Sequence, residues 1–90
     1  MTEAERKRIA ESLAMKRALE TLDTVDAGLS EGALFDFVER SVGRRLTVAD
    51  RAGLKAKMLE KEWIADYRDR LTDETKYCIT QAGRLAMVAL

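Results

Sequence analysis

Few residues in this 90-residue chain have side chains suited to acid–base or nucleophilic chemistry. The chain has no histidine and one cysteine, Cys78. It therefore lacks the Ser–His and Cys–His pairs of nucleophilic catalysis, the ligands of a zinc finger and an internal disulfide. Its acids also lack the spacing of a calcium-binding loop. We expect no enzyme, no bound metal and no cofactor.

The chemistry that remains is ionic, because the charges are unevenly distributed along the chain. Sixteen acids and sixteen bases give a net charge of zero, yet residues 20–39 carry −6 and residues 40–61 carry +5. Two interpretations stay open. The basic segment forms a patch that binds a partner, or the two segments face each other within the fold.

The elements that must position these charges are mostly helical. A capping box at Thr2–Glu5 predicts a first helix over about residues 3–21, within an N-terminal segment 1–22. Its apolar residues form two patches, one for its own core and one for a second subunit, unless a monomer covers both. We expect a homodimer through the first and last helices. The residues predicted for its contact are Ile9, Leu13, Met15, Leu19, Leu22 and Leu85.

A second helix is predicted over about residues 30–42, with an apolar stripe and Gly43 at its end. The next segment, Leu46–Ile64, contains Gly53 within a helical pattern. We interpret it as a short helix 47–52, a turn at Gly53 and a second helix over about 54–62. The expected buried residues are Val48, Ala49, Ala52, Leu54 and Leu59.

Two aromatic and β-branched runs, at 63–67 and 76–80, flank a polar stretch and predict a β-hairpin. Thr80 then caps a last helix within residues 81–90. The predicted class is α+β, mostly α, in one domain over residues 1–90. It divides into an N-terminal helix (1–22), a helical core (30–64) with the helix-turn-helix at 47–62, a hairpin (63–80) and a C-terminal helix (81–90).

The order of these elements resembles the winged helix-turn-helix superfamily, of the MarR and PadR type found in bacterial regulators. The similar motifs are LEKEWI (Leu59–Ile64) and YCITQAGR (Tyr77–Arg84), and the resemblance covers about residues 29–86. It implies a three-helix core with a β-hairpin wing, an additional N-terminal helix and a C-terminal helix.

The resemblance further implies binding of double-stranded DNA in transcription regulation. Residues 54–62 would be the recognition helix and residues 65–76 the wing. Phosphate contacts are expected from Arg44, Arg45, Arg51, Lys55, Lys57 and Lys61, and backbone or minor-groove contacts from Arg68 and Arg70.

Two features depart from that pattern. Residues 54–62 contain no Asn, Gln, Ser, Thr or Arg, the side chains best suited to reading base edges. The wing also carries Asp69, Asp73 and Glu74, which a phosphate backbone repels. The alternative function is therefore a winged-helix module that binds another protein through the acidic segment 20–39 or through the hairpin.

No apolar run approaches the length of a membrane span, and the N-terminus lacks the apolar core of a secretory signal. We expect a cytoplasmic protein with no membrane contact.

Overall fold

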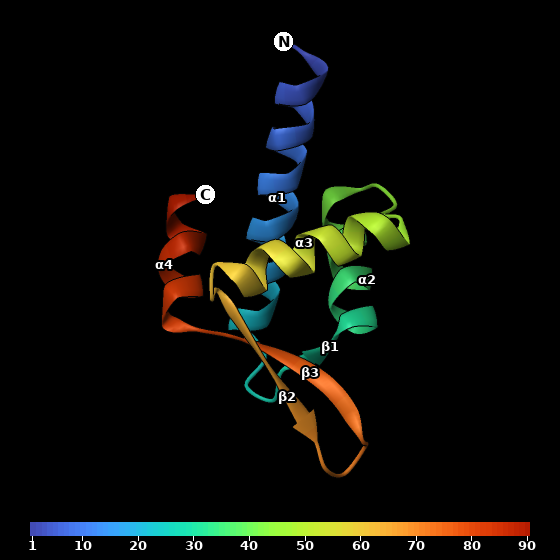
Figure 1. Ribbon diagram of the computed structural model, residues 1–90, viewed down its shortest axis with the longest axis vertical. Coiled ribbons are helices and arrows are strands. Elements are labelled where there is room, and N and C mark those ends of the chain that lie inside the picture. The colour runs from blue at the N-terminus through green and yellow to red at the C-terminus, as the bar shows by residue number, and fades with distance from the viewer.

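The computed structural model describes residues 1–90 and contains four helices and a three-stranded antiparallel sheet. In chain order the elements are α1 (Glu3–Asp23), β1 (Leu29–Ser30), α2 (Glu31–Val42), α3 (Val48–Glu60), β2 (Ile64–Asp69), β3 (Glu74–Ile79) and α4 (Gln81–Ala89). The helices occupy the upper part of the molecule and the hairpin extends below them (Figure 1). The predicted class, mostly helical α+β with a helical core, a hairpin wing and a helix at each end, is confirmed.

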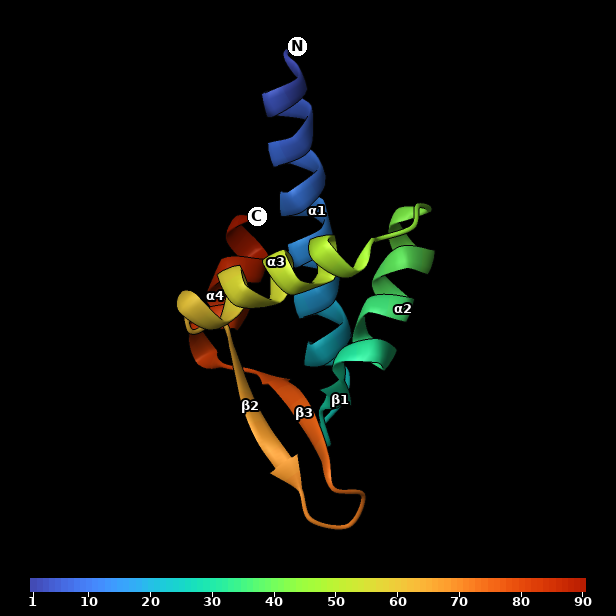
Figure 2. The same cartoon turned by 45° about the vertical axis from the view of Figure 1, so that its right-hand side comes forward.

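The first helix, α1, has two halves with different surroundings. The side chain of Thr2 accepts a hydrogen bond from the backbone N–H of Glu5, as the capping motif predicts. Residues 3–13, here called the α1 arm, extend beyond the other helices (Figure 2), and the buried residues begin at Ala14. Met15, Leu19 and Leu22 lie in the core, so their assignment to a dimer contact is wrong. The neighbouring elements already cover that face of α1.

The helix α2 begins and ends where the sequence indicates. Ser30 caps its N-terminus, and Gly43 ends it in the left-handed conformation with φ = 72°. Residues with a Cβ disfavour that conformation, which explains the glycine. Leu34, Phe35 and Val38 are buried against the core.

The predicted turn at Gly53 is wrong, because α3 is one continuous helix from Val48 to Glu60. The capping box of Thr47 and Asp50 starts this helix, and Leu54 and Met58 anchor it in the core. Gly53 lies on its open side and costs only helix propensity, about 1 kcal/mol relative to alanine. The helix-turn-helix is therefore α2, the turn 43–47 and α3. The residues expected inside at Val48, Ala49 and Ala52 are exposed.

The sheet has the strand order β1-β3-β2. The strands of the hairpin are displaced from the predicted 63–67 and 76–80, and a shorter turn connects them. The strand β1 was not predicted, because two residues carry no alternation. It is defined only by the pairing of Leu29 with Tyr77 and of Ser30 with Lys76.

The last helix, α4, is fixed to the end of the hairpin. Thr80 accepts a hydrogen bond from the N–H of Gly83, as predicted for a helix cap. A side chain at the buried Gly83 would collide with the carbonyl group of Trp63, so a glycine is required there. None of the four helices is both long and apolar enough to cross a membrane.

Candidate nucleic-acid interface

The helix α3 lies across the front of the helical part, and one of its sides faces solvent along its whole length (Figures 1 and 2). From its start to Ala56, that side carries the small side chains of Val48, Ala49, Ala52, Gly53 and Ala56, and the exposed Glu60 follows at its end; Val48 is 86% exposed. None of these small side chains has a hydrogen-bonding group. This side of α3 therefore allows a partner to approach the helix backbone but discriminates little by hydrogen bonding.

A carboxylate fixes the start of α3 relative to α2. Glu39 accepts a hydrogen bond from the backbone N–H of Leu46 at 2.8 Å and pairs with the guanidinium of Arg51 at 2.5 Å. The Leu46 N–H, together with Arg51, lowers the pKa of Glu39. Asp36 pairs with the same guanidinium at 3.0 Å. The turn 43–47 is thus tied to both flanking helices.

The first turn of α3 is held in the same manner. Asp50 accepts a hydrogen bond from the backbone N–H of Thr47 at 3.0 Å, and the Thr47 hydroxyl accepts one from the N–H of Asp50 at 3.0 Å. The backbone N–H of Thr47, and then the Thr47 hydroxyl, lower the pKa of Asp50. Thr47 and Asp50 thus form a capping box at the start of α3.

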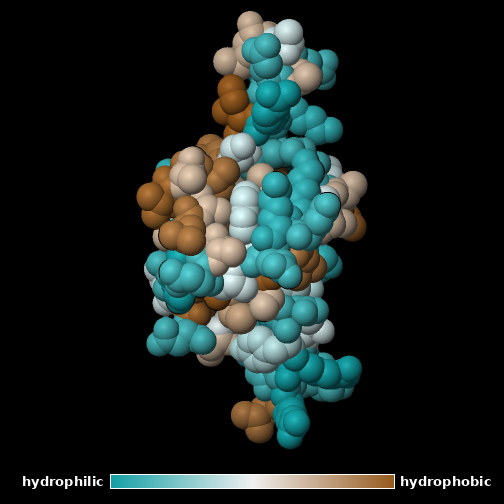
Figure 3. All heavy atoms as spheres, turned by 60° about the vertical axis from the view of Figure 1, so that its left-hand side comes forward, coloured by the Kyte–Doolittle hydropathy of each residue, from teal (hydrophilic) through white to brown (hydrophobic).

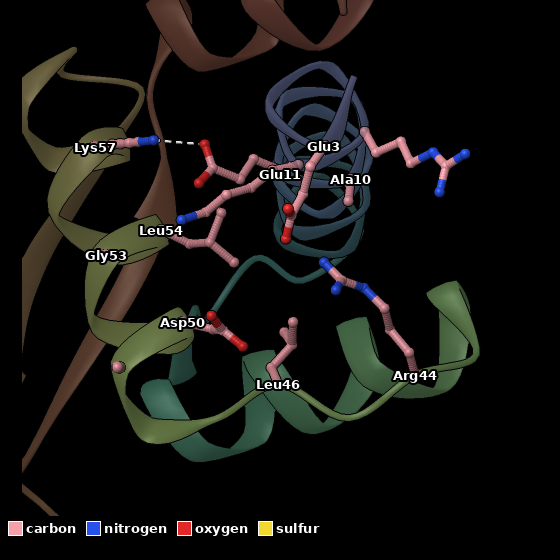
Figure 4. A pocket seen from close by; sticks show the side chains of 12 residues that line it. Glu3, Ala10, Glu11, Arg44, Leu46, Asp50, Gly53, Leu54 and Lys57 are labelled. Carbon is pink, nitrogen blue, oxygen red and sulfur yellow. Dashed lines mark hydrogen bonds and ion pairs between the residues drawn. The ribbon is translucent and has the colours of Figure 1, made fainter. Parts of the chain in front are cut away.

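The bases of α3 are paired with acids of other helices. Arg51 is bound to Asp36 and Glu39, while Lys55 lies 3.3 Å from Glu31. Lys57 lies 2.5 Å from Glu11 of the α1 arm (Figure 4). These three bases, all predicted as phosphate contacts, therefore contribute less positive surface than the sequence indicates.

The acidic segment is neutralised by the same arrangement. Five of its six acids form ion pairs, and Asp26 is the exception. The two remaining pairs join Glu20 to Arg17 and Asp23 to Arg84. Part of the acidic segment thus faces the basic segment, which is one of the two interpretations of the charge pattern.

Four other predicted contact residues form no ion pair. Arg44 and Arg45, in the turn before α3, are exposed and form no ion pair. At the other end of α3, Lys61 forms no ion pair and its ammonium group lies 5.3 Å from the centre of the Trp63 ring. Arg70, in the turn of the hairpin, is also exposed and unpaired. The unpaired cations among the predicted residues thus lie at both ends of α3 and on the wing.

Two of the four acids of the wing are paired within the hairpin, and Asp66 and Glu74 form no ion pair. Asp69 pairs with Lys76 at 2.8 Å and accepts a hydrogen bond from the N–H of Leu71 at 2.9 Å. Lys76, and then Leu71, lower the pKa of Asp69. Arg68 pairs with Asp73 at 2.8 Å. The repulsion of DNA phosphates expected from Asp69 and Asp73 is therefore reduced. The predicted phosphate contact Arg68 is itself paired with an acid.

Two bases that sequence reasoning did not assign, Arg6 and Lys7, lie on the α1 arm beside α3 and line a groove together with Arg44. The signal in the sequence is the run of three bases Arg6–Arg8, within an N-terminal segment of mixed charge.

A second surface is apolar and lies on α1 and α4. Ile9 and Leu13 of the α1 arm are exposed, as are Leu85 (67%) and Val88 (82%) of α4. Lys16, on the same side of α1, donates a hydrogen bond to the carbonyl of Leu90 at 3.2 Å, so this side continues onto α4. Apolar side chains gather over this region in Figure 3. Three of the predicted dimer residues, Ile9, Leu13 and Leu85, lie on this surface.

The helical pair α2–α3, the three-stranded sheet with its protruding hairpin and the flanking helices define a winged-helix fold. The fold is similar to that of the S. aureus protein MepR in a crystal structure of its complex with DNA, with a TM-score of 0.60 and 18% sequence identity. The match covers 83% of this chain and 50% of the MepR chain, so this chain spans half the length of that protein. The resemblance to MarR-type regulators is thereby confirmed for the fold. No family model and no curated protein matches the sequence.

Proposed function

We propose that this winged-helix domain binds double-stranded DNA with α3 in the major groove and acts as a homodimeric regulator of transcription. One observation carries the proposal. The side of α3 that faces solvent is unobstructed and lies between unpaired cations, Arg44 and Arg45 before it and Lys61 after it. A helix with its side chains is about 10–12 Å across and the major groove is about 12 Å wide, so α3 fits. MepR, which shares the fold, is seen in a complex with DNA.

Contacts with the phosphates of the DNA are expected to dominate the binding. Arg44, Arg45 and Lys61 contact the backbone on either side of the groove, and Arg70 reaches the backbone or the minor groove from the wing. The alanines of α3 contact thymine methyl groups, which needs no hydrogen-bonding side chain. Sequence preference therefore comes from apolar contacts and from the shape of the DNA.

Fluorescence anisotropy with a labelled, randomised duplex pool tests DNA binding. With four phosphate contacts per chain, the slope of log K against log salt between 50 and 200 mM is expected to be roughly −3 to −4 per chain. The pool contains rare sites as well as mixed sequence. Absence of binding at 50 mM salt, or a slope close to zero, would contradict the proposal.

The homodimer is proposed through the apolar surface on α1 and α4. A second copy packed on Ile9 and Leu13 removes these exposed apolar side chains from water, which favours association. Leu85 and Val88 of α4 extend the contact. The last six residues of the chain carry no charged side chain, which favours an apolar contact of this kind.

Sedimentation measures the assembly directly. The expected mass is twice the 10.1 kDa of one chain, and Leu13→Asp is expected to give the monomer. Leu71→Asp is the control, because Leu71 is also exposed to solvent but lies in the hairpin turn. A wild-type monomer at tens of micromolar protein would contradict this part of the proposal.

The second candidate is a module that binds a protein through α3. The small side chains on the exposed side of α3 favour it, because small residues allow the close approach of another helix. The acidic segment 20–39 favours it less, since five of its six acids are paired. The anisotropy experiment separates the two candidates.

A further inference from the structure

An open groove of about 540 Å³ lies between the α1 arm, the turn 43–47 and α3. It lies on the opposite side of α3 from the hairpin, since the α1 arm and the hairpin extend to opposite ends of the molecule (Figure 1). In the close view, the side chain of Arg44 extends from the turn towards α1, and the Lys57–Glu11 pair crosses the space between α3 and α1 (Figure 4). Three separate elements thus contribute charged groups to one space.

The bases of this groove are less engaged than its acids. Four bases line it, Arg6, Lys7, Arg44 and Lys57. Of the three acids, Glu11 is paired with Lys57 and Asp50 is bound to the backbone N–H of Thr47. Arg6, Lys7 and Arg44 form no ion pair, and the lining as a whole, with four bases against Glu3, Glu11 and Asp50, carries a net charge of +1. The groove is therefore suited to an anionic chain.

The walls of the groove allow a close approach. Ala10 of the α1 arm and Ala49 and Gly53 of α3 line it, and their side chains end at the Cβ or earlier. A Cβ built at Gly53 would have no atom within 4 Å. A sugar–phosphate backbone entering from solvent thus meets no large side chain on the α3 wall at these positions.

We propose that this groove holds the phosphate backbone of the DNA strand that borders the major groove on the side away from the wing, through Arg6, Lys7 and Arg44. This inference rests on the proposed DNA binding and extends it. Arg44 belongs to both surfaces, so the groove is continuous with the interface on α3. The protein then contacts the duplex on two sides of α3, through the wing on one side and the α1 arm on the other.

Removal of the two charges of the α1 arm tests the inference. Arg6→Gln and Lys7→Gln keep a good helix former at each position and remove its charge. Each substitution is expected to reduce the magnitude of the salt slope by about 0.9, and the double variant by about 2. Arg8→Gln is the matched control, because Arg8 lies on the same helix but does not line the groove, and it is expected to leave the slope within about 0.3 of the wild type. Circular dichroism verifies that the helix content is unchanged.

Hydroxyl-radical footprinting on a bound duplex locates the contact. The double variant is expected to lose protection on the side of α3 away from the wing, while Arg70→Gln loses protection on the wing side. If the wild type binds DNA and the double variant keeps its slope and its footprint, the groove inference is wrong and DNA binding stands. If the wild type does not bind, both are overturned.

Discussion

The turn 43–47 and the helix α3 carry similar numbers of bases, yet the bases differ in their surroundings. Arg44 and Arg45 in the turn are exposed and pair with no acid. Arg51, Lys55 and Lys57 in α3 each pair with an acid of α1 or α2. A run of bases in a sequence therefore overstates the positive surface, because an ion pair within the fold reduces the charge that a partner meets. The candidate interface depends more on the ends of α3 than on its middle.

The largest difference between the two regions is expected in DNA affinity. Arg44→Gln with Arg45→Gln removes two free phosphate contacts, so the affinity at 50 mM salt should fall roughly 10- to 100-fold and the salt slope by about 2. Lys55→Gln with Lys57→Gln removes paired charges and is expected to change the affinity only a few-fold. Anisotropy titrations of both double variants measure the contrast. Equal losses would show that the pairs open on binding.

Lowering the pH is expected to destabilise the fold at the turn 43–47, because the carboxylates that hold this turn become protonated. The pKa values of Glu39 and Asp50 lie below their usual 4.5 and 3.8, so both carboxylates stabilise the folded state above those values. This stabilisation is lost as the pH falls through the lower folded-state pKa values, because the unfolded chain binds protons first. Thermal unfolding followed by circular dichroism from pH 7 to pH 3 should show decreasing midpoints below about pH 4.5.

The Glu39→Gln variant is the control for the acid effect. It should unfold at a lower temperature than the wild type at pH 7 and depend less on pH, because it lacks one of the carboxylates whose pKa is lowered in the folded state. A wild-type midpoint that stays constant from pH 5 to pH 3 would contradict the assignment.

Removing the acid that pairs with one base of α3 should make that base available to DNA, as the bases of the turn 43–47 are. Glu11→Gln frees Lys57, so DNA affinity is expected to rise about two- to five-fold and the salt slope to increase in magnitude by at most about 1. Glu5→Gln is the control, because Glu5 is exposed on the same helix and pairs with no base. If both variants gain equally, the effect comes from net charge and not from Lys57.

The smallest expected effect is a change in stability on substitution of two glycines, Gly43 in the turn and Gly53 in α3. Gly53→Ala in α3 should stabilise the protein by about 1 kcal/mol, since the position is helical and open. Gly43→Ala should destabilise it by about 1–2 kcal/mol, because alanine disfavours φ = 72°. Urea unfolding of both variants measures the difference. Destabilisation by Gly53→Ala would favour a turn at that position.

Local signals explain most of the predicted elements. Thr2, Ser30, Thr47 and Thr80 each cap a helix, and Gly43 ends one, because caps and left-handed glycines depend on neighbouring residues alone. The same reasoning predicted a turn at Gly53 that is not there. The loss of helix propensity at one glycine is too small to break a helix that is capped and anchored in the core. The strand β1 was missed for the opposite reason, because it exists only through its pairing with β3.

The candidate site was predicted in part. The segment that carries it, residues 44–61, stands out by its charge, but the pairing of Lys57 with Glu11 spans 46 residues of sequence, and no local pattern reveals it. The burial of Met15, Leu19 and Leu22 likewise depends on which helix packs on which patch of α1. Arg6 and Lys7 were overlooked because they join Arg44 only when α1 lies beside α3.

The sequence by itself determined the helix caps, the hairpin, the winged-helix order of the elements and the absence of histidine chemistry, because these follow from residue type and short-range hydrogen bonding. The tertiary structure alone decided which bases are free, which apolar patch of α1 remains exposed and that α3 is a single helix. Ion pairing and burial depend on contacts between segments far apart in the chain. A net charge of zero is therefore compatible with either function until the fold shows which charges are paired with one another.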